Sequence, residues 1–247
     1  MKNFLLILGL FCAICASAQT SVKMNTQKPV GEEFTIMVNS VTNCTVDWGD
    51  GTPVATTPVN NTITGTVAGK YVTIKAYGLN YLDCSEQEVT SLSFTNATGL
   101  ETLIASNNNL TGLIANGLTG LKHLWCDNNS ISTLYLRPLT QLETLVASNN
   151  ALTSLTLPAG GTTTLTDYWV DSNNLNNIVL TGCSSLRTLN VENNNLTKLN
   201  LPVLDAKAEQ VSAEPKNLSI FAMLDNSKLA YMNSMFALIE TLLPERE

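Results

Sequence analysis

Residues 121–136 read LKHLWCDNNSISTLYL, and this stretch decides the fold. It follows the pattern Leu-x-x-Leu-x-Ala/Cys-x-x-Asn-x-Leu-x-x-Leu-x-Leu, with Ile131 at one Leu position. The same pattern begins at six leucines spaced 21, 21, 21, 23 and 21 residues apart, namely Leu79, Leu100, Leu121, Leu142, Leu165 and Leu186. A unit this short cannot bury its apolar side alone, so repeats at one period predict a stacked solenoid.

The pattern also indicates how each repeat folds. Alternating apolar residues, such as Leu124 and Cys126, predict a short strand whose every second side chain points inward. The fixed amide position both donates and accepts hydrogen bonds, so it can satisfy backbone groups of a tight coil. This column contains Gln87, Asn108, Asn129, Asn150, Asn173 and Asn194. The one longer spacing comes from a two-residue insertion within 158–164, interpreted as a local change in the outer wall.

The cysteines of the repeats are expected to be buried apolar side chains. Cys84 and Cys126 share an inward column two repeats apart, about 10 Å at the usual strand spacing, which is too far for a disulfide. Cys183 falls in an apolar linker column with Ala97, Leu118 and Leu139. The even number of cysteines after residue 18 therefore does not predict a disulfide framework here.

The repeat pattern resembles the leucine-rich repeat, and its 21-residue length with Cys at the small position resembles the bacterial internalin-type subclass. The resemblance covers about residues 79 to 201. It implies a mainly β fold, a right-handed leucine-rich-repeat solenoid of six repeats over 79–204, and a bacterial surface or secreted protein.

The segment before the repeats, 19–78, is predicted to be a small β-sandwich-like N-terminal cap. Strands are expected at four runs rich in alternating or β-branched residues, namely Phe34 to Val38, Cys44 to Trp48, Thr62 to Val67 and Tyr71 to Tyr77. The sequence VDWGDGT at 46–52 resembles the signature of PKD-type β-sandwich repeats. A calcium site at Asp47 and Asp50 is the less favoured alternative to a simple turn.

The segment after the repeats, 205–247, is predicted to be a connector followed by a C-terminal capping helix. Seven apolar residues fall on one helical face, namely Leu229, Met232, Met235, Phe236, Ile239, Leu242 and Leu243. Such a helix would cover the open end of a solenoid. A partner-binding helix is the alternative.

Residues 1–18 are predicted to be a secretory signal peptide cleaved after Ala18, because a basic start precedes a short apolar run and a small-x-small site. A lipoprotein signal that uses Cys12 or Cys15 is the alternative. No later segment approaches the roughly 18 apolar residues of a membrane span. The location expected from this segment is secreted, at the cell surface or in the periplasm.

Composition narrows the classes of function. The net charge of -7 argues against nucleic acid or an anionic membrane as a partner. The lone histidine, His123, excludes multi-His metal sites. We find no Ser or Cys to act as its nucleophile, no phosphate loop and no metal-ligand spacing, so neither a catalytic site nor a cofactor or metal site is predicted.

The strand residues that point outward are expected to form columns on a concave face. The candidate ligand-binding residues on this face are Tyr81, Ile104, His123, Trp125, Asp127, Val146, Asp167, Trp169 and Asp171. Exposed aromatic residues with a polar rim are typical of interaction sites. The alternative is that β-branched and aromatic residues merely pair across the sheet.

The sequence therefore predicts an exported, non-enzymatic protein that binds another protein through its concave face, in adhesion or host contact. A carbohydrate-binding role, with Trp125 and Trp169 stacking on sugar rings, is one alternative. A structural envelope component is the other.

Overall fold

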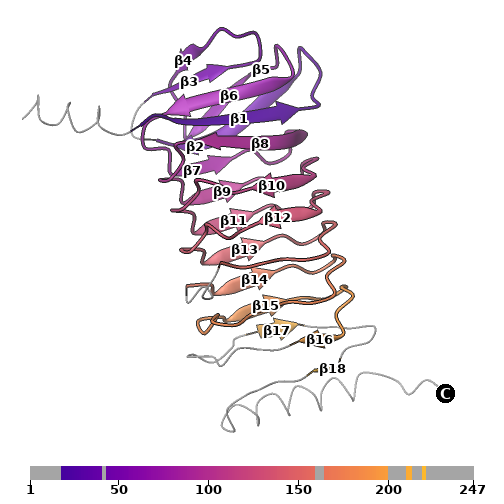
Figure 1. Cartoon of the computed structure of the whole chain (residues 1–247). Coiled ribbons are helices and arrows are strands. Elements are labelled where there is room, and N and C mark those ends of the chain that lie inside the picture. The colour runs from indigo at the N-terminus through magenta and orange to yellow at the C-terminus, as the bar shows by residue number, and fades with distance from the viewer. Residues whose placement is uncertain (1–17, 41–42, 159–163, 200–209, 213–218, 221–247) are drawn as a thin grey trace, which may run out of the picture.

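The computed structural model describes residues 18–40, 43–158, 164–199, 210–212 and 219–220. Over these residues the chain forms strands and turns and contains no helix. In Figure 1 the strands stack as successive layers from the N-terminal sheets to the last repeats. Within this part of the chain, accordingly, no helix is long and apolar enough to cross a membrane.

The repeats build one long parallel sheet along one side of the stack. In each repeat the strand of this sheet begins two residues after the first Leu, and equivalent residues such as Leu103, Leu124 and Leu145 lie side by side in register. The strands follow in the order β7 (Tyr81–Asp83), β9 (Thr102–Ile104), β11 (His123–Trp125), β13 (Thr144–Val146), β14 (Asp167–Trp169), β15 (Thr188–Asn190) and β17 (Gln210–Ser212). The predicted β-solenoid with a 21-residue spacing is confirmed.

A second, shorter set of parallel strands is formed by residues that follow the long-sheet strands along the chain. It pairs β10 (Gly112–Ile114) with β12 (Thr133–Tyr135), and an isolated bridge from Tyr135 to Thr156 continues it. Two further strands, β16 (Lys198–Leu199) and β18 (Ser219–Ile220), also pair in parallel. Several turns of the solenoid therefore use a second strand position, and the first position is the more continuous.

The N-terminal strands cover the first repeat, and they pair antiparallel within two sheets. β2 pairs with β5 and also with β7, so it extends the long sheet beyond the first repeat. The other sheet has the order β4-β3-β6-β1-β8, in which β8 belongs to the first repeat. Their bounds are β1 (Thr20–Thr26), β2 (Glu33–Asn39), β3 (Cys44–Asp47), β4 (Val54–Thr56), β5 (Thr62–Thr66), β6 (Tyr71–Ala76) and β8 (Val89–Thr95). All four strands expected before the repeats are present, and the structure adds β1 and β4.

The side chain of Asp47 stabilises the turn after β3 through hydrogen bonds to its backbone. The Asp47 carboxylate accepts hydrogen bonds from the backbone N–H groups of Gly49 (2.8 Å) and Gly51 (3.0 Å). Gly49 has φ +116°, and a Cβ on it would lie 2.5 Å from the backbone nitrogen of Gly69. Only glycine fits this crossing of two backbone segments. The described residues contain no group of three or more potential metal ligands, here or elsewhere.

The amide column works as a ladder between repeats. Asn108 accepts from the backbone N–H groups of Gln87 (3.1 Å) and Val89 (2.8 Å). Its Nδ2 donates to the carbonyl oxygens of Cys84 and Ala105, and to that of Ser106. The later Asn residues repeat the arrangement, as at Asn173. One side chain thus satisfies backbone groups of two consecutive turns.

The first repeat departs from this ladder where it meets the N-terminal strands. Gln87 replaces Asn, and its Oε1 accepts from the backbone N–H of Thr35 in β2 at 2.9 Å. The longer side chain reaches a strand that the shorter Asn would not reach. The sequence departure at 87 therefore marks the junction between repeat and cap.

The interior is one hydrophobic cluster that runs from Val22 to Leu199. Cys84, Cys126 and Cys183 are buried and form no disulfide, as predicted, and the same holds for Cys44. Burial raises the pKa of Cys84 to about 12, with a smaller contribution from the charge of Asp83. The thiol of Cys84 is therefore protonated and unreactive near neutral pH.

The predicted fold class is wrong in its C-terminal helical cap. The described chain is all β, and its last elements are the strands β17 and β18. β17 lies within the segment expected to be a loose connector and pairs in parallel with β15, so backbone pairing continues the sheet there. The residues assigned to the helix, Leu229 to Leu243, lie outside the described residues, as do residues 1–17 of the predicted signal peptide and residues 159–163 of the insertion.

Candidate binding face

The outward residues of the long sheet form a face that we call the strand face. It consists of the residues two, four and six positions after the first Leu of each repeat. In β11 and β13 the central residues, Leu124 and Leu145, are fully buried, whereas their flanking neighbours are half-buried. Alternation along each strand therefore sends the candidate residues to the surface, and the predicted register is confirmed.

An apolar and aromatic column runs through the middle of the strand face. Pairing sets Ile104 beside Trp125, Trp125 beside Val146, and Val146 beside Trp169. Trp169 is 38% exposed, while the other three are half-buried. These four side chains are contiguous across four strands, so they form one surface and not scattered positions.

His123 lies next to this column on β11. Its ring centroid is 5.7 Å from that of Trp125, with the rings inclined by 33°. Its Nδ1 lies 3.2 Å from the hydroxyl of Thr144, and its Nε2 lies 4.0 Å from a carboxylate oxygen of Glu143. These contacts hold the imidazole against the indole.

The carboxylates on the strand face are oriented by neutral donors. Asp127 accepts from the hydroxyl of Ser106 at 2.5 Å and from the side-chain amide of Asn128 at 2.7 Å. Asp171 accepts from the hydroxyl of Ser148 in the preceding repeat. Because hydroxyls and amides carry no charge, these hydrogen bonds fix the carboxylates without neutralising them.

The remaining two candidates are Asp167, on β14 with Trp169, and Tyr81, on the first strand of the repeats. Asp167 accepts from the hydroxyl of Thr166 at 2.8 Å. Tyr81 lies on β7, beside Asn39 of the N-terminal strands and away from the Trp pair. Burial, followed by the charge of Asp83, raises the pKa of Tyr81. The structure thus groups the candidates around Trp125 and Trp169 and leaves Tyr81 apart.

Sequence reasoning missed the residues that orient the site. Ser106 and Ser148 occupy the same column as the aspartates they contact, so their position was visible, but the direction of each hydroxyl was not. Glu143 precedes the strand residues by one position and was not assigned to the face. Its contact with His123 depends on the path of the chain as it enters β13.

The described residues define a β-solenoid protein whose strand face carries a half-buried to exposed aromatic and apolar column rimmed by carboxylates. No protein-family model matches the sequence, and no curated protein matches it.

Proposed function

We propose that this is an exported, non-enzymatic leucine-rich-repeat protein of the internalin type that binds a protein partner through the strand face. The resemblances in its sequence suggest a bacterial cell-surface or secreted protein, in adhesion or host contact, with a PKD-like segment before the repeats. The observation that carries the proposal is the contiguous column from Ile104 to Trp169. A rigid sheet that holds aromatic side chains at the surface suits a partner, since their burial on binding is favourable.

Carbohydrate binding is the second candidate. The observation in its favour is the exposure of Trp169 between the carboxylates two residues before and after it, those of Asp167 and Asp171. Indole faces stack on sugar rings, and carboxylates accept hydrogen bonds from hydroxyl groups. A structural envelope component without a specific ligand is the third.

The binding experiment compares the wild-type protein with a Trp125→Ala/Trp169→Ala double variant on arrays of glycans and of host extracellular proteins. Loss of a protein ligand in the variant supports the proposal, and loss of a glycan ligand supports the second candidate. Val54→Ala/Val59→Ala is the matched control, because both valines are exposed far from the strand face. Binding that survives the double Trp substitution would refute the site.

Export is tested separately. Expression in a bacterial host should yield a mature protein that begins at Gln19, as read by N-terminal sequencing. A mature N-terminus at a lipid-modified Cys12 or Cys15 would instead support the lipoprotein alternative.

A further inference from the structure

The charge on the strand face is one-sided. Among the eighteen outward positions of the six repeats, five are acidic and none is Lys or Arg, the five being Asp83, Asp127, Asp167, Asp171 and Glu192. The four aspartates have no Lys, Arg or His nitrogen within 4.0 Å among the described residues. The face is therefore both aromatic and negatively charged.

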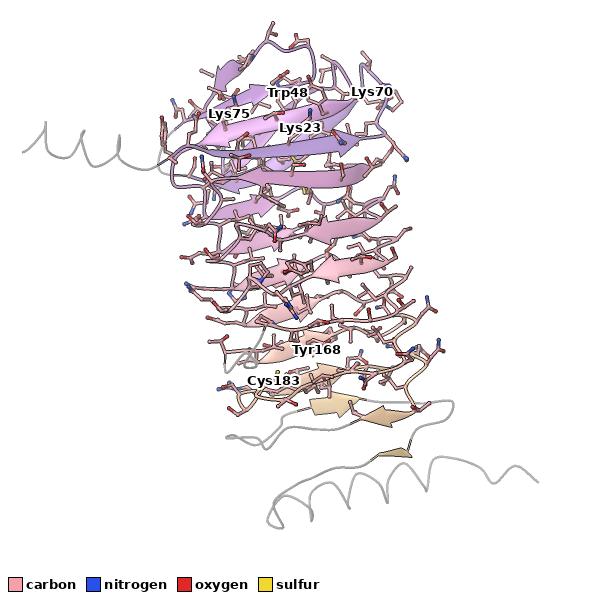
Figure 2. The ribbon with its side chains drawn as sticks, viewed as in Figure 1. Lys23, Trp48, Lys70, Lys75, Tyr168 and Cys183 are labelled. Carbon is pink, nitrogen blue, oxygen red and sulfur yellow. The ribbon has the colours of Figure 1, made fainter. Side chains whose placement is uncertain are left out.

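Lys122, one position before β11, forms an ion pair with Glu101 at 3.1 Å, and a further group of lysines lies at the N-terminal end of the molecule. Lys23 and Lys75 are exposed on β1 and β6 of the N-terminal sheet, where the Lys23 ammonium lies 3.6 Å from the centroid of the Tyr71 ring. Figure 2 places both lysines in the uppermost layers, well separated from the level of Tyr168 in β14. The negative charge of the strand face is thus not offset by these lysines.

Around Trp169, aromatic character and negative charge occur together, in β14 and the two residues that follow it. Asp167, Trp169 and Asp171 alternate with the buried Tyr168 and Val170, so all three point to the same side. Residues two apart in a strand are separated by about 7 Å. An exposed indole thus lies between two carboxylates, each within reach of a group placed over the ring.

We infer that the partner presents arginine side chains to this face, one of which stacks on Trp169 while Asp167 and Asp171 bind its guanidinium. This inference rests on the proposed function and specifies the chemistry of the partner. Arginine suits the site better than lysine, because a guanidinium is planar, stacks on aromatic faces and donates to carboxylates in a fork.

The hydroxyl contacts make the site ready for such a ligand. Ser148 holds Asp171 and Thr166 holds Asp167, so the carboxylates need little reordering when the guanidinium arrives. A second position of similar composition lies two strands away, where Trp125 has Asp127 on one side and His123 on the other. Two arginines spaced about 10 Å apart can therefore engage the face at once.

A neutral sugar would use this arrangement less fully. It can stack on Trp169 and donate to the aspartates, but it cannot use their uncompensated charge. Peptides consequently provide the sharper probe. The probe is a Gly/Ser peptide with two arginines three positions apart, and its twin carries citrulline, which keeps the shape of arginine without the charge.

Affinity of the full chain for both peptides is measured by titration calorimetry at low and at physiological salt. The arginine peptide should bind, and the citrulline twin should bind at least about tenfold more weakly. Asp167→Asn/Asp171→Asn should weaken the arginine peptide about tenfold, while Asn keeps the acceptor that Ser148 uses. Added salt should weaken the wild-type complex more than the variant complex.

The control variant is Glu32→Gln/Glu33→Gln, which removes the same charge from two exposed residues at the start of β2. It should leave the affinity within about twofold, since exposed charges this far away are screened. Equal binding of the two peptides, equal loss in both acidic variants, or no binding of the arginine peptide overturns the inference.

The proposed function fails in a different way. A protein ligand from the arrays that is lost with the Trp125/Trp169 pair but bound normally by Asp167→Asn/Asp171→Asn overturns the arginine inference alone. Survival of that ligand on the double Trp variant overturns the proposed function. A glycan ligand that is lost with the Trp pair and unaffected by the Asn pair overturns both.

Discussion

At the scale of single residues, the fold depends on amides placed once per repeat. Asn108 is only 7% exposed and takes part in five hydrogen bonds, all to backbone groups of its own or the preceding repeat. The carbonyl oxygens of Ala105 and Ser106 also accept from other donors, so shortening the side chain mainly affects the N–H groups of Gln87 and Val89 and the carbonyl of Cys84. A polar residue inside the stack is therefore part of its structure.

We expect Asn108→Ala to lower the free energy of unfolding by about 3 kcal/mol, since it leaves several buried backbone groups unsatisfied. Guanidinium unfolding followed by circular dichroism measures the change. Asn116→Ala, at an exposed turn, is the control and should change the free energy by less than about 0.5 kcal/mol. Equal effects of the two substitutions would show that the amide ladder contributes little.

A second single-residue feature is the left-handed backbone one position before each amide. Asn107, Asn128, Asn149 and Asn193 have φ between 51° and 54° there, whereas the fifth repeat has Ser172 at φ 55°. Asn tolerates this conformation better than Ser. Ser172→Asn should therefore raise the free energy of unfolding by about 0.5 kcal/mol, whereas Ser172→Val should lower it. Denaturant midpoints compare the two variants, and stabilisation by Val would contradict the explanation.

At the scale of the element, the fifth repeat shows how one turn adapts its interior. Its inward strand position holds Tyr168, where the other repeats have Leu, and Tyr168 is 1% exposed. Its linker position holds Cys183, where the second and third repeats have Leu118 and Leu139. Burial, and to a lesser extent the nearby Cys183 thiol, raise the pKa of Tyr168, and Figure 2 labels the two residues close together. A large side chain at one position and a small one at the other keep the volume of the turn nearly constant.

This compensation predicts a coupling between the two positions. Cys183→Leu alone should destabilise by about 1–3 kcal/mol through overpacking, and Tyr168→Leu alone by at least about 2 kcal/mol through a cavity. The double variant should lose less than the sum of the two. A double-mutant cycle from denaturant unfolding measures the difference, and strict additivity would mean that the side chains do not share space.

The element scale also separates what the sequence predicts from what it does not. The repeat period and alternation predict the strands β7, β9, β11, β13, β14 and β15, because each is formed by a local pattern that recurs, whereas β8, β10 and β12 are not predicted. The strand β1 is not predicted, since its two inward apolar residues, Val22 and Met24, are too few to signal a strand. Its partners β6 and β8 are remote in sequence, so only the folded chain brings them together. On the strand face, periodicity places the Trp pair, whereas the hydroxyl donors to the aspartates depend on side-chain torsions that no pattern records.

At the scale of the whole molecule, the N-terminal strands and the repeats share one interior. β2 joins the long sheet directly to β7, and the hydrophobic cluster is continuous from Val22 to Leu199. Repeat proteins stabilise each turn through its neighbours, so a sheet that covers the first turn supplies the neighbour that this turn lacks. The N-terminal region therefore acts as an integral cap.

We consequently expect the two regions to unfold together. The chain has three Trp, so Trp125→Phe/Trp169→Phe leaves Trp48 to report on the N-terminal strands, and Trp48→Phe/Trp125→Phe leaves Trp169 to report on the solenoid. In each variant the fluorescence transition in guanidinium should coincide with the far-ultraviolet circular dichroism transition.

Gly65→Ala supplies a local perturbation, because a Cβ there would lie 2.2 Å from the Trp48 ring. Gly65→Ala is made in the Trp125→Phe/Trp169→Phe variant, which retains Trp48. Trp48 fluorescence then reports on the N-terminal strands, and circular dichroism reports on the whole sheet. A single transition at a lower midpoint is the result that a shared interior requires, whereas an early, separate loss of Trp48 fluorescence would show that the cap unfolds on its own.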